Sequence, residues 1–365
     1  TYLSTMPNYN ARWETTVQTS AGIDLGLFGN TLEVSVDWSR KLTQDLSDRR
    51  PVPATLGLNQ EHMGNIGNVL NTGWETSINY SNSAANGQLT YNINGNYSYN
   101  KGYVVDYGVR DGAVMHSDPS IFGTTILHSQ AGEPWYSYLV YKTEGIFRSQ
   151  DEIDNYTWTN PENGATNKVQ PNAKPGDLKF ADLDDNGKID DNDKYFAGSY
   201  APVHTFSFGG SLNFKGFDFS IMFQGVAGNK IYNGLKQLGL RGGNSGDGVC
   251  NFTAETLQTW DFDNQNSKYP RLECGVTAGS NGNYSKISDL FVEKGDYLRL
   301  KNITLGYTLP KFGKNMPGIR FYFSADNVCT FTPYTGIDPE VGNYGIDRGV
   351  YPLSRFFNFG VNLNF

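Results

Sequence analysis

The chain ends on Phe357-Asn-Phe-Gly-Val-Asn-Leu-Asn-Phe365, nine residues in which apolar side chains alternate with polar or small ones. A period of two places every apolar side chain on one face of a strand and the others on the opposite face. In a soluble sheet, such an aromatic edge would promote aggregation. In a membrane β-barrel, lipid covers the apolar face and a neighbouring strand covers the edge. The stretch therefore predicts a strand that closes a transmembrane β-barrel.

The same alternation recurs in pairs of segments that are joined by short turns. The paired segments are 17–27 with 32–38, 74–80 with 89–99, and 204–214 with 217–223, followed by 297–309, 319–325 and the terminal strand. In segment 297–309 the pattern changes phase near Lys301-Asn302, which predicts a β-bulge there. In segment 204–214, Phe206, Phe208, Leu212 and Phe214 are expected to face outward. The chain thus has about nine segments of the length that a tilted membrane strand needs, roughly 9–11 residues.

Long loops separate these pairs, at residues 47–67, 101–203 and 226–296. Short turns at one end and long loops at the other are typical of outer-membrane barrels. Residues 134–141 resemble a strand, and residues 101–203 hold either no further crossing or two, so the total is nine or eleven. Within the last long loop, residues 253–260 predict a helix with Thr253 as its N-cap.

Composition excludes several classes of protein. The 365 residues are 38% hydrophobic and contain no run of 18 apolar residues, which excludes a transmembrane helix. The 23 Tyr, 22 Phe and 42 Gly favour a barrel, although a large secreted β-protein is also compatible with them. A net charge of -8 without a basic block argues against nucleic acid. We find no catalytic carboxylate pair, nucleophile elbow or phosphate loop and expect no enzymatic activity. Cys250 and Cys274 share one loop, and whether they pair stays open.

One motif predicts a metal site. Residues 182–193 match the calcium-loop template D-x-D-x-N-G-x-I-D-x-x-D and contain six Asp and one Lys. The template assigns metal ligands to Asp182, Asp184, Asn186, the Lys188 carbonyl, Asp190 and Asp193. Gly187 permits the sharp turn, and Ca²⁺ is favoured over Mg²⁺ because all ligands are protein oxygens. The last ligand is Asp rather than Glu and no helices are expected to flank the loop, so we expect a structural ion of weak affinity, on the order of 10⁻⁴–10⁻³ M.

Several stretches together resemble a known family. Gly295-Asp-Tyr-Leu-Arg-Leu-Lys-Asn-Ile-Thr-Leu-Gly-Tyr-Thr-Leu-Pro310 is similar to a late-barrel signature of SusC/RagA-type TonB-linked outer-membrane transporters. The same family is suggested, in order, by Trp13-Glu14 with Asp24-Leu-Gly-Leu-Phe28, Asn68-Val-Leu-Asn-Thr-Gly-Trp-Glu75, Pro175-Gly-Asp-Leu-Lys-Phe180 followed by 182–187, Lys215-Gly-Phe-Asp-Phe219 with Phe223-Gln-Gly225, and Asp326-Asn327. The resemblance covers essentially the whole chain.

The resemblance implies an all-β fold, an antiparallel transmembrane barrel of about 22 strands that is closed by a plug. Residues 1–365 would form its C-terminal part, with a calcium-binding-like loop at 175–198 and a long extracellular loop at 226–296. We expect no plug or N-terminal domain within residues 1–365, and the chain resembles the C-terminal half of such a transporter, either truncated or split from the rest. The implied location is the outer membrane of a Gram-negative bacterium of the Bacteroidetes type.

The resemblance also implies function. A SusC/RagA-type transporter imports nutrients such as oligosaccharides or peptides, under a SusD-like lipoprotein lid, and is driven by TonB through its N-terminal region. Its partners would further include outer-membrane lipid. Two alternatives stay open from the residues alone: a secreted Ca²⁺-dependent carbohydrate-binding or adhesion module, and a passive porin. Loop aromatics such as Trp135, Trp158, Trp260, Tyr334 and Tyr344 are candidates for stacking on sugar rings, although loop packing is the simpler explanation. The residues do not indicate which substrate is imported.

Overall fold

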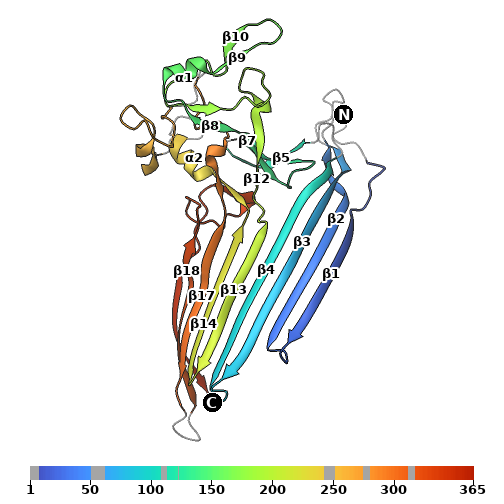
Figure 1. The fold of residues 1–365 in the computed structure, drawn as a ribbon, viewed down its shortest axis with the longest axis vertical. Helices are drawn as coiled ribbons and strands as arrows, with labels where there is room; N and C mark the ends of the chain where they lie inside the picture. The colour runs from blue at the N-terminus through green and yellow to red at the C-terminus, as the bar shows by residue number, and fades with distance from the viewer. Residues whose placement is uncertain are drawn as a thin grey trace, which may run out of the picture.

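The computed structural model describes residues 8–50, 62–107, 113–121, 123–241, 251–273, 280–310 and 317–365. Its largest element is a single sheet of nine strands. In their order across the sheet these are β1 (Thr15–Leu27), β2 (Leu32–Arg50), β3 (His62–Ala84), β4 (Leu89–Tyr107), β13 (His204–Phe214), β14 (Phe217–Ala227), β17 (Tyr297–Thr308), β18 (Gly318–Phe331) and β20 (Phe356–Asn364). All neighbours are antiparallel and lie side by side along the long axis of the molecule (Figure 1).

The order of the strands settles the number of crossings. β4 pairs directly with β13, from His204 opposite Tyr99 to Phe214 opposite Leu89. The described residues between these two strands therefore add no strand to the large sheet, and the count is nine rather than eleven. The strand suggested at 134–141 does exist, as β7 (Ser137–Tyr141), but it belongs to a smaller sheet.

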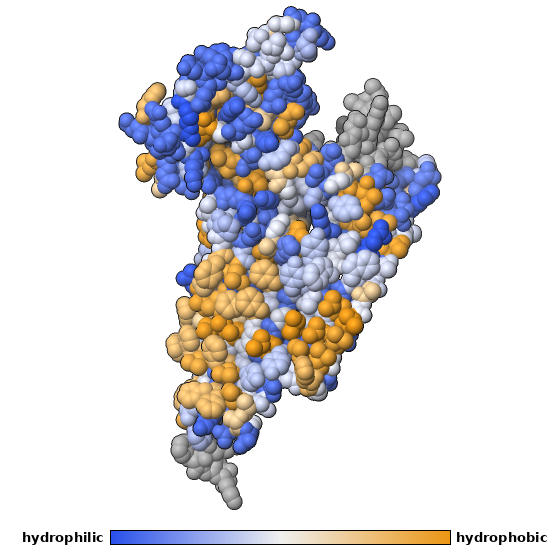
Figure 2. Space-filling view, in the orientation of Figure 1, coloured by the Kyte–Doolittle hydropathy of each residue, from blue (hydrophilic) through white to orange (hydrophobic). Residues whose placement is uncertain are grey.

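The two faces of the sheet differ as the alternation predicts. On β20, Phe357, Phe359 and Val361 are exposed, and Phe359 retains 83% of its surface. The register places them beside outward-facing Phe323 and Phe321 of β18. Aliphatic side chains form the same surface at the other end of the sheet, and Figure 2 shows an apolar area spanning its lower part. These exposed apolar residues would be a liability in water and are suited to lipid.

The register of the sheet shifts in β17 and in β2. The predicted bulge near Lys301 is confirmed, because the pairing of β17 shifts between Leu300 and Asn302 against both β14 and β18. The expected loop at 47–67 is wrong in its bounds, since β2 continues to Arg50 and β3 already begins at His62. The pairing shifts between Thr43 and Leu46, so the strict alternation is lost there although the strand goes on.

A second body, here called the head, lies at one end of the sheet and is built from the long connections (Figure 1). Its strands are β5 (Ala113–Ile121), β6 (Thr124–Gln130), β7, β8 (Thr143–Ile146), β9 (Thr157–Thr159), β10 (Thr166–Lys168), β11 (Leu178–Phe180), β12 (Lys194–Ser199), β15 (Lys230–Asn233), β16 (Val292–Lys294) and β19 (Ile346–Asp347). Its helices are α1 (Gln150–Asn155) and α2 (Gly234–Arg241), with short 3-10 turns at Asp191–Asp193, Ala254–Gln258, Asp289–Phe291 and Asn343–Gly345.

The main apolar core of the molecule lies in the head rather than in the sheet. Tyr138, Tyr232 and Phe291 are fully buried there, and they come from β7, β15 and the turn before β16. Segments that are about 150 residues apart in sequence thus form one core. Among the described residues, no helix is both long enough and apolar enough to cross a membrane.

Two predictions about the long loop at 226–296 are wrong. Residues 254–258 form a 3-10 turn rather than an α-helix, and the Thr253 side chain caps nothing. The α-helix of this region is α2, which has glycines at 234 and 239 and for that reason carried a weak helix signal. Gly239 is needed, because a Cβ there would lie 2.3 Å from the Thr253 methyl. Cys250 and Cys274 lie outside the described residues, and Cys329 is a free thiol.

Candidate functional site

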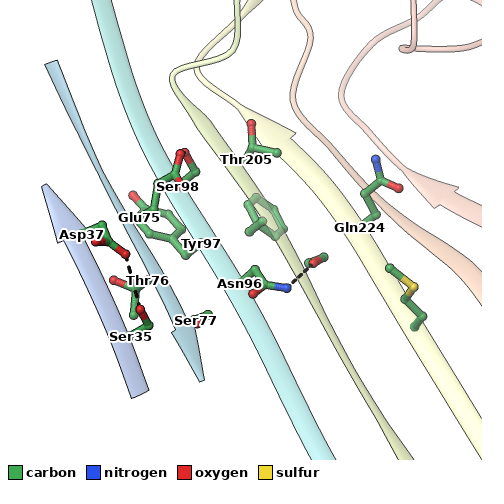
Figure 3. A pocket seen from close by; sticks show the side chains of 13 residues that line it. Ser35, Asp37, Glu75, Thr76, Ser77, Asn96, Tyr97, Ser98, Thr205 and Gln224 are labelled. Atoms are coloured by element: carbon green, nitrogen blue, oxygen red, sulfur yellow. Dashed lines mark hydrogen bonds between the residues drawn. The ribbon is translucent and has the colours of Figure 1, made fainter. Parts of the chain in front are cut away.

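The inward face of the sheet carries a polar hollow of about 440 Å³. Hydroxyl and amide side chains from β2, β3, β4, β13 and β14 line it together with the carboxylates of Asp37 and Glu75, as Figure 3 shows, and Met222 adds an apolar contact. Asn96 donates to Ser207 at 3.5 Å across the β4–β13 pair, and Ser35 donates to Asp37 at 3.4 Å. The hydroxyl and amide groups can donate hydrogen bonds to a passing polar molecule or accept them from it.

Acidic side chains are also concentrated on this inward face. Asp37 of β2 lies directly opposite Glu75 of β3, and both are exposed. Asp24 accepts a hydrogen bond from Ser35 at 2.5 Å, and Glu33 accepts one from Asn79 at 3.2 Å. Like charges directly opposite one another destabilise a sheet, so this pair requires water or positive charge on the inward side.

Further along the sheet an ion pair spans a whole strand. Arg320 of β18 donates to Asp218 of β14 at 2.8 Å, although β17 lies between them. The contact passes over Gly306, where a Cβ would lie 2.5 Å from both carboxylate oxygens of Asp218. The glycine of the sequence signature at 295–310 therefore makes room for an inward-facing ion pair.

The same signature contains an anchor for the loop between β18 and β20. Arg299, 2% exposed, donates to Asp338 at 2.7 Å and to Glu340 at 3.0 Å. The hydroxyl of Tyr297 donates to Glu340 at 2.6 Å. The sequence identifies this stretch only by its family resemblance. Tyr297 and Arg299 are two residues apart, so their side chains lie on the same face of the strand. This spacing is the one feature of the sequence that indicates the anchor.

The acidic loop connects strands β11 and β12. The prediction that no α-helices flank this loop is confirmed in the described residues. It folds on itself through backbone amides. Asp182 accepts from Gly187 N at 2.8 Å and Asn186 N at 3.1 Å, while Asp193 accepts from Leu183 N and Asp190 N, each at 2.7 Å. Gly187 has a φ of +83° and packs against the ring of Trp158, so a side chain is excluded there.

Three of the predicted ligands converge in this loop. One carboxylate oxygen each from Asp182, Asp184 and Asp193 lies within 4.8 Å of the others. Asp193 is completely buried, and Asp182 is partly buried. Burial raises the pKa of Asp182, and the charges of Asp193 and Asp184 act in the same direction, against the lowering effect of the amides of Gly187 and Asn186. A hard divalent cation would relieve this repulsion, and the oxygen donors suit Ca²⁺.

The remaining predicted ligands are occupied by protein contacts. Asp190 forms an ion pair with the Lys188 ammonium at 2.8 Å, and this hydrogen bond holds the pKa of Asp190 at about 2. The Asn186 amide nitrogen donates to Asp184 at 2.9 Å and to Asp190 at 3.2 Å. The structure thus assembles three of the six ligands, and the Asn186 and Asp190 side chains would have to turn to complete the shell.

Another lysine, in addition to Lys188, lies near the acidic loop. Lys286 packs over the rings of Phe180 and Tyr141, at 4.7 Å and 5.1 Å from their centroids. Its burial lowers the pKa of the ammonium, whereas Asp193, Glu273 and Asp191 raise it. The loop is therefore partly neutralised by the protein itself. Sequence reasoning missed Lys286 because it lies about 100 residues away from the motif.

The candidate stacking aromatics do not form one surface. Trp260 is 5% exposed and Tyr334 is also 5% exposed, so both serve packing. Trp158 covers Gly187, and Trp135 packs against the cluster of Ile66 and Val104 and edge-on to Tyr136. Tyr344 is exposed and stacks on Tyr136 at 4.9 Å between ring centroids. Of the five, Tyr344 alone combines exposure with a stacked neighbour.

Comparison with known proteins gives consistent similarities. The chain is 34% identical over 381 residues to TonB-dependent receptor P3 of Formosa agariphila, and the match covers all of this chain and 35% of the relative. It is 26% identical over 374 residues to TonB-dependent receptor SusC of Bacteroides thetaiotaomicron, covering 98% of this chain and 32% of the relative. The chain thus spans about a third of the length of these relatives. No protein-family profile matches it.

A solved structure shows the same fold. The structure of the RagAB peptide transporter superposes with a TM-score of 0.75 at 23% identity. The match covers 100% of this chain and 36% of the compared chain. The nine-stranded sheet and the head therefore share the fold of part of that chain.

Proposed function

Because this chain is a barrel segment of the SusC/RagA-type TonB-dependent receptors of the outer membrane, we propose that it forms part of the wall of a nutrient importer. The observation that carries this proposal is the contrast between the two faces of the nine-stranded sheet. The outward face is apolar and suited to lipid, and the inward face is lined by hydroxyl, amide and carboxylate groups. A polar solute can pass along such a wall while the membrane remains sealed.

The proposed cargo is an oligosaccharide or a peptide. Hydroxyl and amide side chains such as Ser98, Asn96 and Gln224 can exchange hydrogen bonds with either kind of molecule. The RagAB relative is described as a peptide transporter, which favours peptides without deciding for this chain. Energy coupling to TonB is proposed for the whole protein, through parts outside this barrel segment.

The head is proposed to face the cell exterior and to contact a SusD-like lipoprotein lid. The segment 251–273 exposes large apolar side chains: Leu257 is 86% exposed and Phe262 is 79% exposed. Phe262 packs edge-on against Trp260, which fixes its position. Exposed apolar side chains on an otherwise folded loop mark an interaction surface.

Lid association can be tested with a double variant, Leu257→Ser with Phe262→Ser. We expect it to reduce co-purification of the lipoprotein at least tenfold, because two apolar anchors are lost while the core around Phe291 is untouched. Leu183→Ser, which changes an exposed leucine of the acidic loop, is the matched control and should retain the lipoprotein. Full co-purification by the double variant would exclude this segment as the lid contact.

We also propose that the acidic loop binds one Ca²⁺ as a structural ion. Support comes from the three convergent carboxylates of Asp182, Asp184 and Asp193 and from the burial of Asp193. Asn186, the Lys188 carbonyl and Asp190 would complete the shell, as the sequence template indicates. When bound, the ion supplies positive charge that holds the loop against β11 and β12. Isothermal titration calorimetry with carboxylate variants of the loop tests this site.

A further inference from the structure

The outward face of the sheet carries two cations beside its apolar surface. Arg40 of β2 and Lys101 of β4 both pair with Thr72 of β3, so the three residues form one row across neighbouring strands. The same alternation that turns Trp38 and Trp74 outward places this row on the lipid-facing side. Arg40 and Lys101 are exposed, and neither has an ion-pair partner among the described residues.

The position of the row along the strands is informative. Arg40 lies eight residues beyond Leu32 at the short turn, and Lys101 lies twelve beyond Leu89. At about 3.3 Å per residue and a tilt of about 40°, these distances correspond to roughly 20 Å and 30 Å along the membrane normal. The apolar band of an outer-membrane barrel is about 25 Å tall. The row therefore lies at the upper edge of the band, where the head begins.

Aromatic residues support this placement. One row below, Trp38, Trp74 and Tyr99 face outward side by side. Tryptophan and tyrosine in such a row are typical of the interface between hydrocarbon and headgroups. Along this face, Figure 2 shows an apolar lower part, a pale zone above it, and a mixture of hydrophilic and apolar residues above that. Arg40 and Lys101 thus lie at the depth of lipid headgroups.

Charge is divided between the two faces of β1 to β4. The carboxylates of Asp24, Asp37 and Glu75 lie on the inward face, and no outward-facing residue between 17 and 27, 32 and 42, 70 and 84, or 89 and 103 is acidic. Within these ranges, the cations of the row therefore have no protein anion on their own face of the sheet. The backbones of Arg40 and Lys101 are roughly 10 Å apart, because one strand lies between them. Their long side chains and the Thr72 hydroxyl between them can bind one phosphate group.

We propose that the row Arg40–Thr72–Lys101 binds a phosphorylated lipid of the outer leaflet. The phosphate would accept hydrogen bonds from the Arg40 guanidinium, the Thr72 hydroxyl and the Lys101 ammonium. The acyl chains would lie over the apolar surface below Trp38 and Trp74. The inference rests on the orientation proposed above, with the head outside, and adds a binding site on the surface that faces away from the transport path.

The test measures binding of bis-phosphorylated lipid A to the full-length receptor in detergent. We compare wild type with the double variant Arg40→Gln, Lys101→Gln. Each basic residue near a charged lipid surface contributes roughly fivefold in affinity, so the pair should weaken binding on the order of 30-fold. Lys41→Gln is the matched control, because Lys41 is the neighbouring cation on β2 but faces inward. It should bind as wild type does.

Further measurements distinguish lipid binding from misfolding and from capture of free phosphate. The charge-conserving variant Arg40→Lys, Lys101→Arg should retain binding, which shows that the barrel folds with altered side chains in the row. Equal binding of the dephosphorylated lipid, or undiminished binding by the double Gln variant, would overturn the proposal. Displacement of the lipid by millimolar inorganic phosphate would assign the row to free phosphate instead. A receptor that is soluble without detergent would refute the proposed function itself, which distinguishes the two failures.

Discussion

At the residue scale, backbone amides hold Asp182 and Asp193 in place within the acidic loop, and the Asn186 side chain holds Asp184. Asp182 and Asp193 each accept two amide hydrogen bonds, which orient their oxygens toward Asp184 before any ion arrives. Preorganisation of this kind lowers the cost of assembling a cation site. The same geometry concentrates negative charge, so the loop without a cation is strained electrostatically.

The first prediction concerns this loop. Asp182→Asn with Asp184→Asn should reduce Ca²⁺ affinity at least tenfold from a wild-type value on the order of 10⁻⁴–10⁻³ M, because two charged ligands are lost. Isothermal titration calorimetry of the full-length protein measures it. Asp185→Asn is the control, since Asp185 belongs to the same loop but not to the carboxylate cluster. Equal Ca²⁺ uptake by the double variant would refute the site.

The pH dependence of Ca²⁺ binding follows from the pKa of Asp182. Burial raises that pKa, so the folded loop without ion takes up a proton at higher pH than the unfolded chain does. Protons and Ca²⁺ then compete for the same oxygens. We expect the affinity to begin to fall at a pH above the ordinary Asp value of 3.8, and an affinity that is constant down to that pH would contradict the assignment. Titrations in a series of buffers measure it.

At the scale of elements, the loop between β18 and β20 is fastened to the wall by one arginine. Arg299→Ala should leave Asp338 and Glu340 without their cation and destabilise the loop by about 3–5 kcal/mol, the cost of removing one partner of a buried pair. Limited proteolysis should then cleave between residues 332 and 355. Arg320→Ala breaks the more exposed pair with Asp218 and serves as the control. Equal protection in both variants would show that the anchor is dispensable.

A glycine on β17 allows a contact that spans three strands. Gly306→Ala would place a Cβ 2.5 Å from the Asp218 carboxylate and displace the ion pair with Arg320, at a cost of roughly 1–3 kcal/mol. Gly95→Ala is the matched control, because its Cβ would meet only ordinary contacts at 3.7 Å and beyond. Urea unfolding of the barrel in detergent compares the two variants. Equal free energies of unfolding for the two variants would show that the missing side chain at Gly306 is not needed for stability.

Sequence patterns predicted the strands better than the connections, and the reason is physical. Phe206, Phe208 and Leu212 follow a period of two because one face of β13 is apolar, so the sequence predicts both ends of this strand. The bulge at Lys301 was readable because it breaks that alternation. The head core joins Tyr138, Tyr232 and Phe291, which no local period connects. Likewise the acidic motif revealed three convergent ligands, while Lys286 and the Arg299 anchor depend on tertiary contacts.

At the scale of the whole molecule, the sheet is open within the described residues. β1 and β20 each pair on one side only and not with each other. An aromatic strand such as β20 with an unpaired edge is stable when another strand and lipid cover it. We therefore infer that further strands of the complete protein pair with β1 and β20 and close the barrel.

The last prediction separates the importer from the secreted module that composition also allowed. An outward face with exposed side chains such as Phe321, Phe359 and Leu363 requires a hydrocarbon environment over all nine strands. The full-length protein should therefore be found in the outer-membrane fraction, need detergent for extraction and run faster on gels before heating than after. A monomer in detergent-free buffer would favour the secreted module. Steady ion conductance in planar bilayers without any unfolding of a plug would favour the passive porin, because an importer with a plugged barrel stays closed until TonB acts on it.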